Sequence, residues 1–161
     1  MQFKKGKVFF GFKDTWQMDE QLSKVILAGV SKFKEVINEE GGHRKGVPAS
    51  ISSHLHSEGV ITYGDDYNLS DGDYATCEAY FDYVIDEIIY AFSDNEPDIM
   101  DYDFEYKPSK ELSDETGMVS FNLECTNQSE SDRYSDDKLA YNKRCLEGRK
   151  LFAEHFHALW W

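Results

Sequence analysis

Two histidine pairs come nearest to a metal-binding pattern in this sequence. The first is His54-Leu-His56, followed by Glu58; an extended chain would place both imidazoles on one side, as a divalent metal requires. The second is His155 and His157 on an expected helix, where two residues span about 200° and the pair cannot share one metal. No HExxH spacing accompanies them. We therefore predict solvated or packing histidines and no metal ligand.

Other motifs that could carry chemistry are weaker still. The stretch Asp66–Asp73 departs from a calcium loop, because its glycine comes one position late and Cys77 stands where a calcium loop has Glu. Acidic neighbours on an expected helix raise the pKa of the Cys77 thiol, which disfavours a nucleophile. The chain contains no GxGxxG, phosphate-loop or GxSxG motif. We predict no catalytic residue and no cofactor. One enzymatic alternative stays open, a metal-dependent hydrolase that uses clustered carboxylates with His54 or His56.

The C-terminal stretch LFAEHFHALWW is predicted to be the packing face of a helix. Its apolar stripe consists of Leu151, Phe152, Phe156, Leu159 and Trp160. Of the two histidines, we expect one to face the core and the other to face solvent. On this interpretation Phe156→Ala destabilises the domain by about 3–5 kcal/mol, and changing either histidine matters far less.

Charge is distributed very unevenly along the chain. The formal net charge is -14, yet the 61 residues between Lys45 and Lys107 contain fifteen Asp and Glu and no Lys or Arg. Residues 1–45 have a balance of +3 and residues 107–161 a balance of -2. Ordinary surfaces intersperse both signs. An anionic surface of this kind repels nucleic acid and anionic membranes and attracts a basic protein.

The acidic residues alternate with aromatic residues in the expected strand Asp101–Lys107. Alternation places three aromatic side chains on one face and three carboxylates on the other, with successive carboxylates about 6.6 Å apart, a spacing comparable to that of nucleic-acid phosphates. The residues predicted to contact a partner are Asp82, Asp86, Glu87, Asp94, Glu96, Asp98, Asp101, Asp103 and Glu105. The competing interpretation is an acidic surface that only maintains solubility.

Apolar periodicity and turn residues predict a single α+β domain, 1–161, with three main helices packed on a small antiparallel sheet. The helices are expected after Asp14-Thr15 with a periodic segment from Leu22 to Ile37, at about Asp73–Phe92, and at about Asp136–Leu159. Strands are expected at Lys7–Phe12, around Val60–Tyr63, at Asp101–Lys107 and at Met118–Thr126. Segments 41–72 and 127–137 are expected to be mobile.

Cysteine usage and hydropathy suggest a cytoplasmic location. Cys77, Cys125 and Cys145 are odd in number and form no CxxC or zinc-type spacing, which indicates reduced thiols. No apolar run is long enough for a signal peptide core or a membrane span. We therefore expect neither membrane insertion nor direct nucleic-acid binding.

Several segments resemble a family of small proteins common in tailed-phage genomes. They are Asp14-Thr-Trp16, Phe33-Lys-Glu35, Gly46-Val-Pro48, Ile85-Asp-Glu-Ile-Ile-Tyr-Ala-Phe92, and Glu147-Gly-Arg-Lys-Leu-Phe-Ala153 running on to Leu159-Trp-Trp161. Where that family has a tryptophan ahead of its second helix, this chain has Tyr80-Phe81. The acidic strand region lies outside the resemblance, which implies a phage origin and a shared fold and implies no activity.

Together these features predict a non-enzymatic phage accessory protein in the cytoplasm of an infected bacterium. Its acidic centre would bind a basic surface of a host or phage protein and so block host defence or modulate another host function. Three alternatives stay open: a nucleic-acid mimic that inhibits a DNA- or RNA-binding enzyme, the metal-dependent hydrolase, and a virion or scaffold component.

Overall fold

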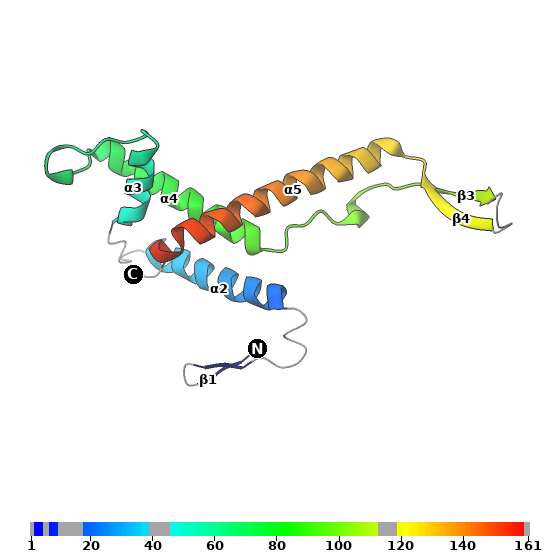
Figure 1. Ribbon diagram of the computed structural model, residues 1–161, viewed down its shortest axis with the longest axis horizontal. Coiled ribbons are helices and arrows are strands. Elements are labelled where there is room, and N and C mark those ends of the chain that lie inside the picture. Colours follow the sequence, from blue (N-terminus) through cyan, green and yellow to red (C-terminus); the bar gives the residue numbers. More distant parts are fainter. Residues whose placement is uncertain (1, 5–6, 10–17, 39–45, 113–118, 160–161) are drawn as a thin grey trace. The chain divides into compact units, whose positions relative to one another are not determined.

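The computed structural model of the chain describes residues 2–4, 7–9, 18–38, 46–112 and 119–159 (Figure 1). Its α-helices are α2 (Met18–Asn38), α3 (Ala49–Ser57), α4 (Asp71–Phe92) and α5 (Gln128–His155), and its strands are β1 (Gln2–Lys4), β2 (Lys7–Phe9), β3 (Tyr106–Leu112) and β4 (Val119–Cys125). The strands form two antiparallel pairs, β1 with β2 and β3 with β4. The α+β class agrees with this mostly helical architecture.

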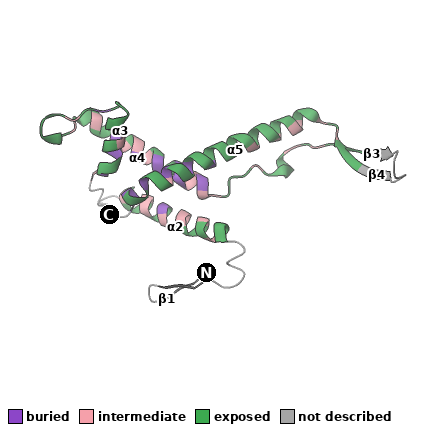
Figure 2. Cartoon of the chain, in the orientation of Figure 1, coloured by how far each residue is buried: buried purple, intermediate pink, exposed green. Residues whose placement is uncertain are grey.

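The expected single domain is not confirmed. The chain divides into two compact units, unit 1 (Met1–Asp94 with Arg144–Trp161) and unit 2 (Asn95–Lys143). Helix α5 contributes to both, because its last part belongs to unit 1. Buried residues lie on α3, α4 and the C-terminal part of α5, whereas the N-terminal part of α5 is exposed or half-buried (Figure 2).

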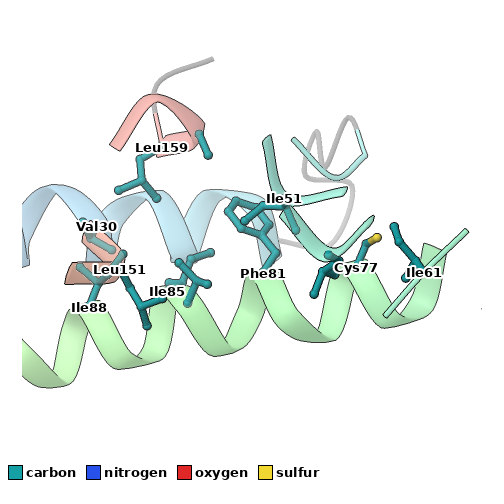
Figure 3. Close-up of a cluster of buried hydrophobic side chains, with 12 residues drawn as sticks. Val30, Ile51, Ile61, Cys77, Phe81, Ile85, Ile88, Leu151 and Leu159 are labelled. Carbon is teal, nitrogen blue, oxygen red and sulfur yellow. The ribbon is translucent and has the colours of Figure 1, made fainter. Parts of the chain in front are cut away.

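Helix α4 is the centre of the core of unit 1. It begins where the Ser70 hydroxyl accepts the backbone N–H of Asp73 at 3.1 Å and donates to the Asp73 carboxylate at 2.7 Å, which caps the free N–H groups of the first turn. The predicted helix Asp73–Phe92 is thus confirmed, with a start two residues earlier. The core side chains are Val30 from α2, Ile51 and Leu55 from α3, Cys77, Phe81, Val84, Ile85 and Ile88 from α4, and Ile61, Leu151, Ala158 and Leu159 (Figure 3).

Helix α3 occupies part of the segment expected to be a loop, and the strand expected at Val60–Tyr63 is not formed. The helix follows Pro48 and ends in a left-handed Gly59 with φ 72°, whose N–H donates to the His56 carbonyl at 3.0 Å. The next N–H, that of Val60, donates to the Leu55 carbonyl at 2.9 Å, which completes a helix-terminating motif that favours glycine. The scattered hydrophobic residues here follow helical spacing.

Helix α5 begins at Gln128, eight residues before the expected start, and so includes most of the segment 127–137. Its C-terminal part corrects the expected apolar stripe. His155, the last residue of α5, lies four residues after Leu151 on the same face and is only 4% exposed, whereas Phe156 begins a 3-10 helix, Phe156–Leu159, and is 40% exposed. His157 is exposed, so one histidine is buried and one is not. Trp160 lies outside the described residues.

The strand predicted at Asp101–Lys107 is wrong in its bounds. The Asp98 carboxylate accepts the Met100 N–H at 2.9 Å and caps a 3-10 turn, Ile99–Asp101, so β3 begins only at Tyr106. Strand β3 pairs with β4 in a register that runs from Tyr106 opposite Cys125 to Leu112 opposite Val119. The second strand was predicted almost correctly.

Helices α4 and α5 approach each other very closely at Gly148. A Cβ atom on this residue would lie 2.2 Å from the backbone oxygen of Glu87 and 2.6 Å from the Cβ of Ala91. Beside this contact the buried Glu87 carboxylate accepts two hydrogen bonds from Arg144, from Nε at 2.8 Å and from Nη2 at 2.7 Å. The guanidinium also lies 3.6 Å from the centre of the Tyr90 ring.

We expect Arg144→Met to destabilise unit 1 by about 2–3 kcal/mol, because it leaves the Glu87 carboxylate buried without its partner. We expect a smaller loss of stability than for a fully buried ion pair, because the Arg144 side chain is 48% exposed. The double variant Glu87→Leu, Arg144→Met should recover most of it. Urea unfolding of these variants measures the effect. Arg149→Met, an exposed arginine one turn away, is the matched control; an equal loss there would contradict the prediction.

No helix in the described part of the chain is long and apolar enough to cross a membrane.

Candidate functional site

The nine acidic residues predicted to contact a partner are distributed over both units. Unit 1 contains Asp82, Asp86, Glu87 and Asp94, and unit 2 contains Glu96, Asp98, Asp101, Asp103 and Glu105. They differ in environment, so they do not all present free charge to solvent.

The members in unit 1 are largely engaged within the fold. Glu87 is buried and paired with Arg144, which removes it from any partner-facing surface. Asp86 forms an ion pair with Lys34 of α2. Asp82 is half-buried, and Asp94 is exposed at the end of α4. The helical spacing of α4 therefore places one of the predicted acids, Glu87, on its inner face.

Unit 2 presents its acids differently. The side chains of Asp98, Asp101, Asp103 and Glu105 are all exposed. Glu96 forms an ion pair with Lys138, and the Asp98 carboxylate caps the turn that follows it. The partner-facing role of these residues stays a prediction.

Aromatic contacts hold this acidic segment in place. The ring of Tyr134 on α5 lies 5.1 Å from that of Tyr102 and 5.7 Å from that of Phe104, and Phe104 stacks on Tyr106 at 6.0 Å. The Tyr102 hydroxyl donates to Asp137 at 2.7 Å, a hydrogen bond that raises the pKa of Tyr102. The predicted separation of aromatic and acidic side chains is thus observed around Tyr102 and Phe104, where the Phe104 N–H donates to the Tyr102 carbonyl at 2.9 Å in a segment without regular secondary structure.

Unit 2 has little buried surface of its own. Among its residues whose side chains are described, none is fully buried. Two apolar side chains lie between the exposed acids, Ile99 at 50% and Met100 at 83% exposed, and Leu123 and Leu139 are exposed as well. With thirteen acidic and five basic residues, unit 2 has a net charge of -8. Unit 2 therefore combines a strongly acidic charge with exposed apolar side chains.

A second group of polar residues meets in unit 1, where α3, α4 and the end of α5 come together. His54 and His155 lie with ring centres 5.5 Å apart and nearly perpendicular, and the Tyr80 hydroxyl is 3.1 Å from Nε2 of His54. Among the residues that the structure describes, neither ring nitrogen of the buried His155 has a hydrogen-bond partner. Burial, and then the neighbouring His54, lower the pKa of His155. Sequence reasoning missed this group because its members are 26 and 75 residues apart.

The other sequence candidates do not join this group. Because α3 is helical, His56 faces away from His54 and its Nδ1 lies 3.3 Å from the Ile61 carbonyl oxygen. In the stretch resembling a calcium loop, Ser70 caps α4, and Asp66 has a left-handed backbone with φ 60°. Burial, and then Asp73, raise the pKa of the Cys77 thiol, in the predicted direction. Within the described residues no group of three or more His, Cys, Asp or Glu side chains is arranged to hold a metal.

Comparison of the chain with models of protein families, with curated proteins and with solved structures finds no match.

Proposed function

We propose that this protein is a non-enzymatic binding protein whose acidic unit 2 docks on a basic surface of another protein. The observation that carries the proposal is the segment from Asp98 to Glu105. It combines exposed carboxylates, exposed Ile99 and Met100, and aromatic contacts that join Tyr102 and Phe104 to Tyr134 of α5. Acidic groups would steer the encounter, and the apolar side chains would supply buried area in the complex.

The resemblance to small tailed-phage proteins supports a setting for this binding. In that setting the protein is a phage accessory factor in the infected cell, and its partner is a host or phage protein whose defence or other function it modulates. Exposed anionic charge also makes direct binding to nucleic acid or to an anionic membrane unfavourable.

A nucleic-acid mimic is the closest alternative function. The structure weakens its main argument, which was the regular spacing of the carboxylates. A mimic requires carboxylates at regular phosphate-like spacing, but Asp101 belongs to a 3-10 turn and β3 starts after Glu105. The apolar Ile99 and Met100 between the acids suit a protein surface better than a nucleic-acid groove.

The test of the proposed function is the triple variant Asp101→Asn, Asp103→Asn, Glu105→Gln. Folding should hardly change, because all three side chains are exposed. Association with the partner captured from infected cells should slow by about tenfold at low salt, and the difference should shrink towards 0.5 M salt, as screening requires. Stopped-flow or surface-binding kinetics measure both rates.

The matched control neutralises three acids of unit 1, in the variant Asp65→Asn, Asp66→Asn, Asp71→Asn. It removes the same formal charge from another exposed region. If association slowed equally in both variants, the effect would come from net charge and not from the surface of unit 2. Unchanged kinetics in the unit 2 variant would contradict the proposed surface.

A further inference from the structure

The antiparallel pair of β3 and β4 has one outer edge that can accept another strand. We propose that β4 binds an extended segment of the partner protein by antiparallel backbone pairing, and that this segment alternates apolar and basic residues. Both strands belong to unit 2, so this site rests on the proposed function and names the kind of segment that unit 2 recognises. Addition of a strand to a sheet edge is a recurring mode of peptide recognition.

The hydrogen bonds of the strand pair decide which backbone groups of β4 point outward. The Thr126 N–H donates to the Glu105 carbonyl at 2.8 Å, one position beyond the pair Tyr106–Cys125. In an antiparallel ladder, hydrogen-bonded pairs alternate with pairs whose N–H and C=O groups point away from the neighbouring strand. The residues of β4 with outward backbone groups are therefore Val119, Phe121, Leu123 and Cys125.

The outer edges of β3 and β4 differ in their ability to pair. On β3 the outward position opposite Leu123 is Pro108, which has no N–H and blocks pairing at that edge. The sequence of β4 contains no proline and no lysine, the residues that commonly protect an edge strand. In the part of the chain that the structure describes, no third strand joins this pair. The edge of β4 is therefore the one open to a further strand.

The side chains beside this edge indicate the sequence of the added strand. Leu123 and Pro108 are directly opposite each other and share one face, where the Leu123 side chain is 71% exposed. Glu124 is exposed and, as the next residue, lies on the other face. A strand with apolar side chains on the Leu123 face and Lys or Arg on the Glu124 face would cover the leucine and pair with the carboxylate.

Charge favours a basic segment over a second copy of this chain. Unit 2 has thirteen acidic and five basic residues, a net charge of -8, so pairing of β4 with β4 of another copy would bring two anionic units together. A basic segment would be attracted instead. Asp103 and Glu105, both exposed and directly before β3, extend this attraction beyond the strands.

Binding of synthetic peptides to the full chain tests strand addition. The probe is a fluorescent peptide of about ten residues that alternates Val and Lys. Antiparallel pairing with the Val side chains on the Leu123 face uses the backbone N–H groups of the Val residues. Methylation of the Val nitrogens should therefore weaken binding by about tenfold or more, whereas methylation of the Lys nitrogens should leave it unchanged. Fluorescence anisotropy measures the affinities.

The two methylated peptides are matched in charge, in side chains and in the number of methyl groups. Equal affinities of these peptides, or no binding of the unmethylated probe, would overturn strand addition. Self-association of the protein that the probe reverses would assign the edge to a second copy and would also overturn the proposed occupant.

A variant of β4 tests the same edge from the side of the protein. Leu123→Pro removes an outward N–H and leaves the inward hydrogen bonds to β3, so it should weaken probe binding by about tenfold or more. Leu123→Ala is the matched control, because it removes the leucine side chain but keeps the N–H, and it should bind the probe more tightly than Leu123→Pro. Equal affinities of the two variants would contradict backbone pairing. Nuclear magnetic resonance contacts between Tyr106 and Cys125 should first show that the strand pair is retained in each variant.

The triple variant Asp101→Asn, Asp103→Asn, Glu105→Gln separates strand addition from the proposed function. If the triple variant binds the probe like the unchanged protein and Leu123→Pro does not, the edge of β4 is supported and the acidic surface is contradicted. If the triple variant binds weakly and the two methylated peptides bind the unchanged protein equally, the acidic surface is supported and strand addition is wrong.

Discussion

Gly148→Ala is expected to destabilise unit 1 by about 3 kcal/mol or more, the upper part of the range for overpacking. The added Cβ would lie 2.2 Å from the Glu87 carbonyl oxygen and 2.9 Å from the Glu87 carbonyl carbon. Both atoms are helix backbone and cannot rotate away as a flexible side chain would. The helices must separate, which also pulls Arg144 from the Glu87 carboxylate. Urea or thermal unfolding measures the loss.

Gly72→Ala is the matched control for this variant. Gly72 lies in the first turn of α4, and the nearest atom to its added Cβ would be the Ser70 hydroxyl oxygen at 3.9 Å, an ordinary contact. Alanine is also the better helix former, so stability should stay equal or rise by about 0.5–1 kcal/mol. A Gly148→Ala protein as stable as Gly72→Ala would contradict the close approach of α4 and α5.

The second large effect is expected at Phe81, where truncation to Ala should cost about 3–5 kcal/mol. Phe81 is 1% exposed and lies in the core with Ile51, and its ring meets Phe33 of α2 edge-on at 6.2 Å. Its removal leaves a cavity bordered by α2, α3 and α4, three helices that cannot all collapse into it. Denaturant unfolding with an unchanged slope would show that the loss is in native stability.

Phe156→Ala is the matched comparison, because it removes the same atoms from a side chain that is 40% exposed. Its cost should be about 1–2 kcal/mol, less than the loss of a buried phenylalanine and less than the sequence alone predicts. Equal losses at Phe81 and Phe156 would mean that the end of α5 is packed more deeply than its exposure indicates.

The parts of the fold that depend on local order could be predicted from the sequence. Periodic apolar residues and the Ser70 cap suffice for α4, and period-two alternation suffices for the aromatic and acidic sides around Tyr102 and Phe104. Both signals arise within a few residues of chain. The absence of basic residues between Lys45 and Lys107 is likewise a property of the sequence alone.

Sequence reasoning went wrong where one local signal competed with another. Scattered hydrophobic residues and serines hid α3, whose short amphipathic face depends on only Ile51 and Leu55. At the end of α5 the aromatic Phe156 was assigned to the core, although helical spacing groups His155 with Leu151. One of the two histidines was expected to face the core, but spacing alone did not show that it would replace Phe156 there, because burial is decided by what packs against the residue.

By itself the sequence determined helix α4, the acidic middle and the aromatic alternation, because each depends on neighbours in the chain. Only the tertiary structure decided which acids are free. Glu87 is neutralised by Arg144, 57 residues away, while Asp101, Asp103 and Glu105 stay exposed. The crossing of α4 and α5 also leaves no room for a Cβ atom at Gly148, and the packing of α3 with the end of α5 brings His54 to His155. These contacts join segments that are distant in the sequence. They are selected by hydrophobic burial, whose free energy depends on the apolar area removed from water and not on sequence separation.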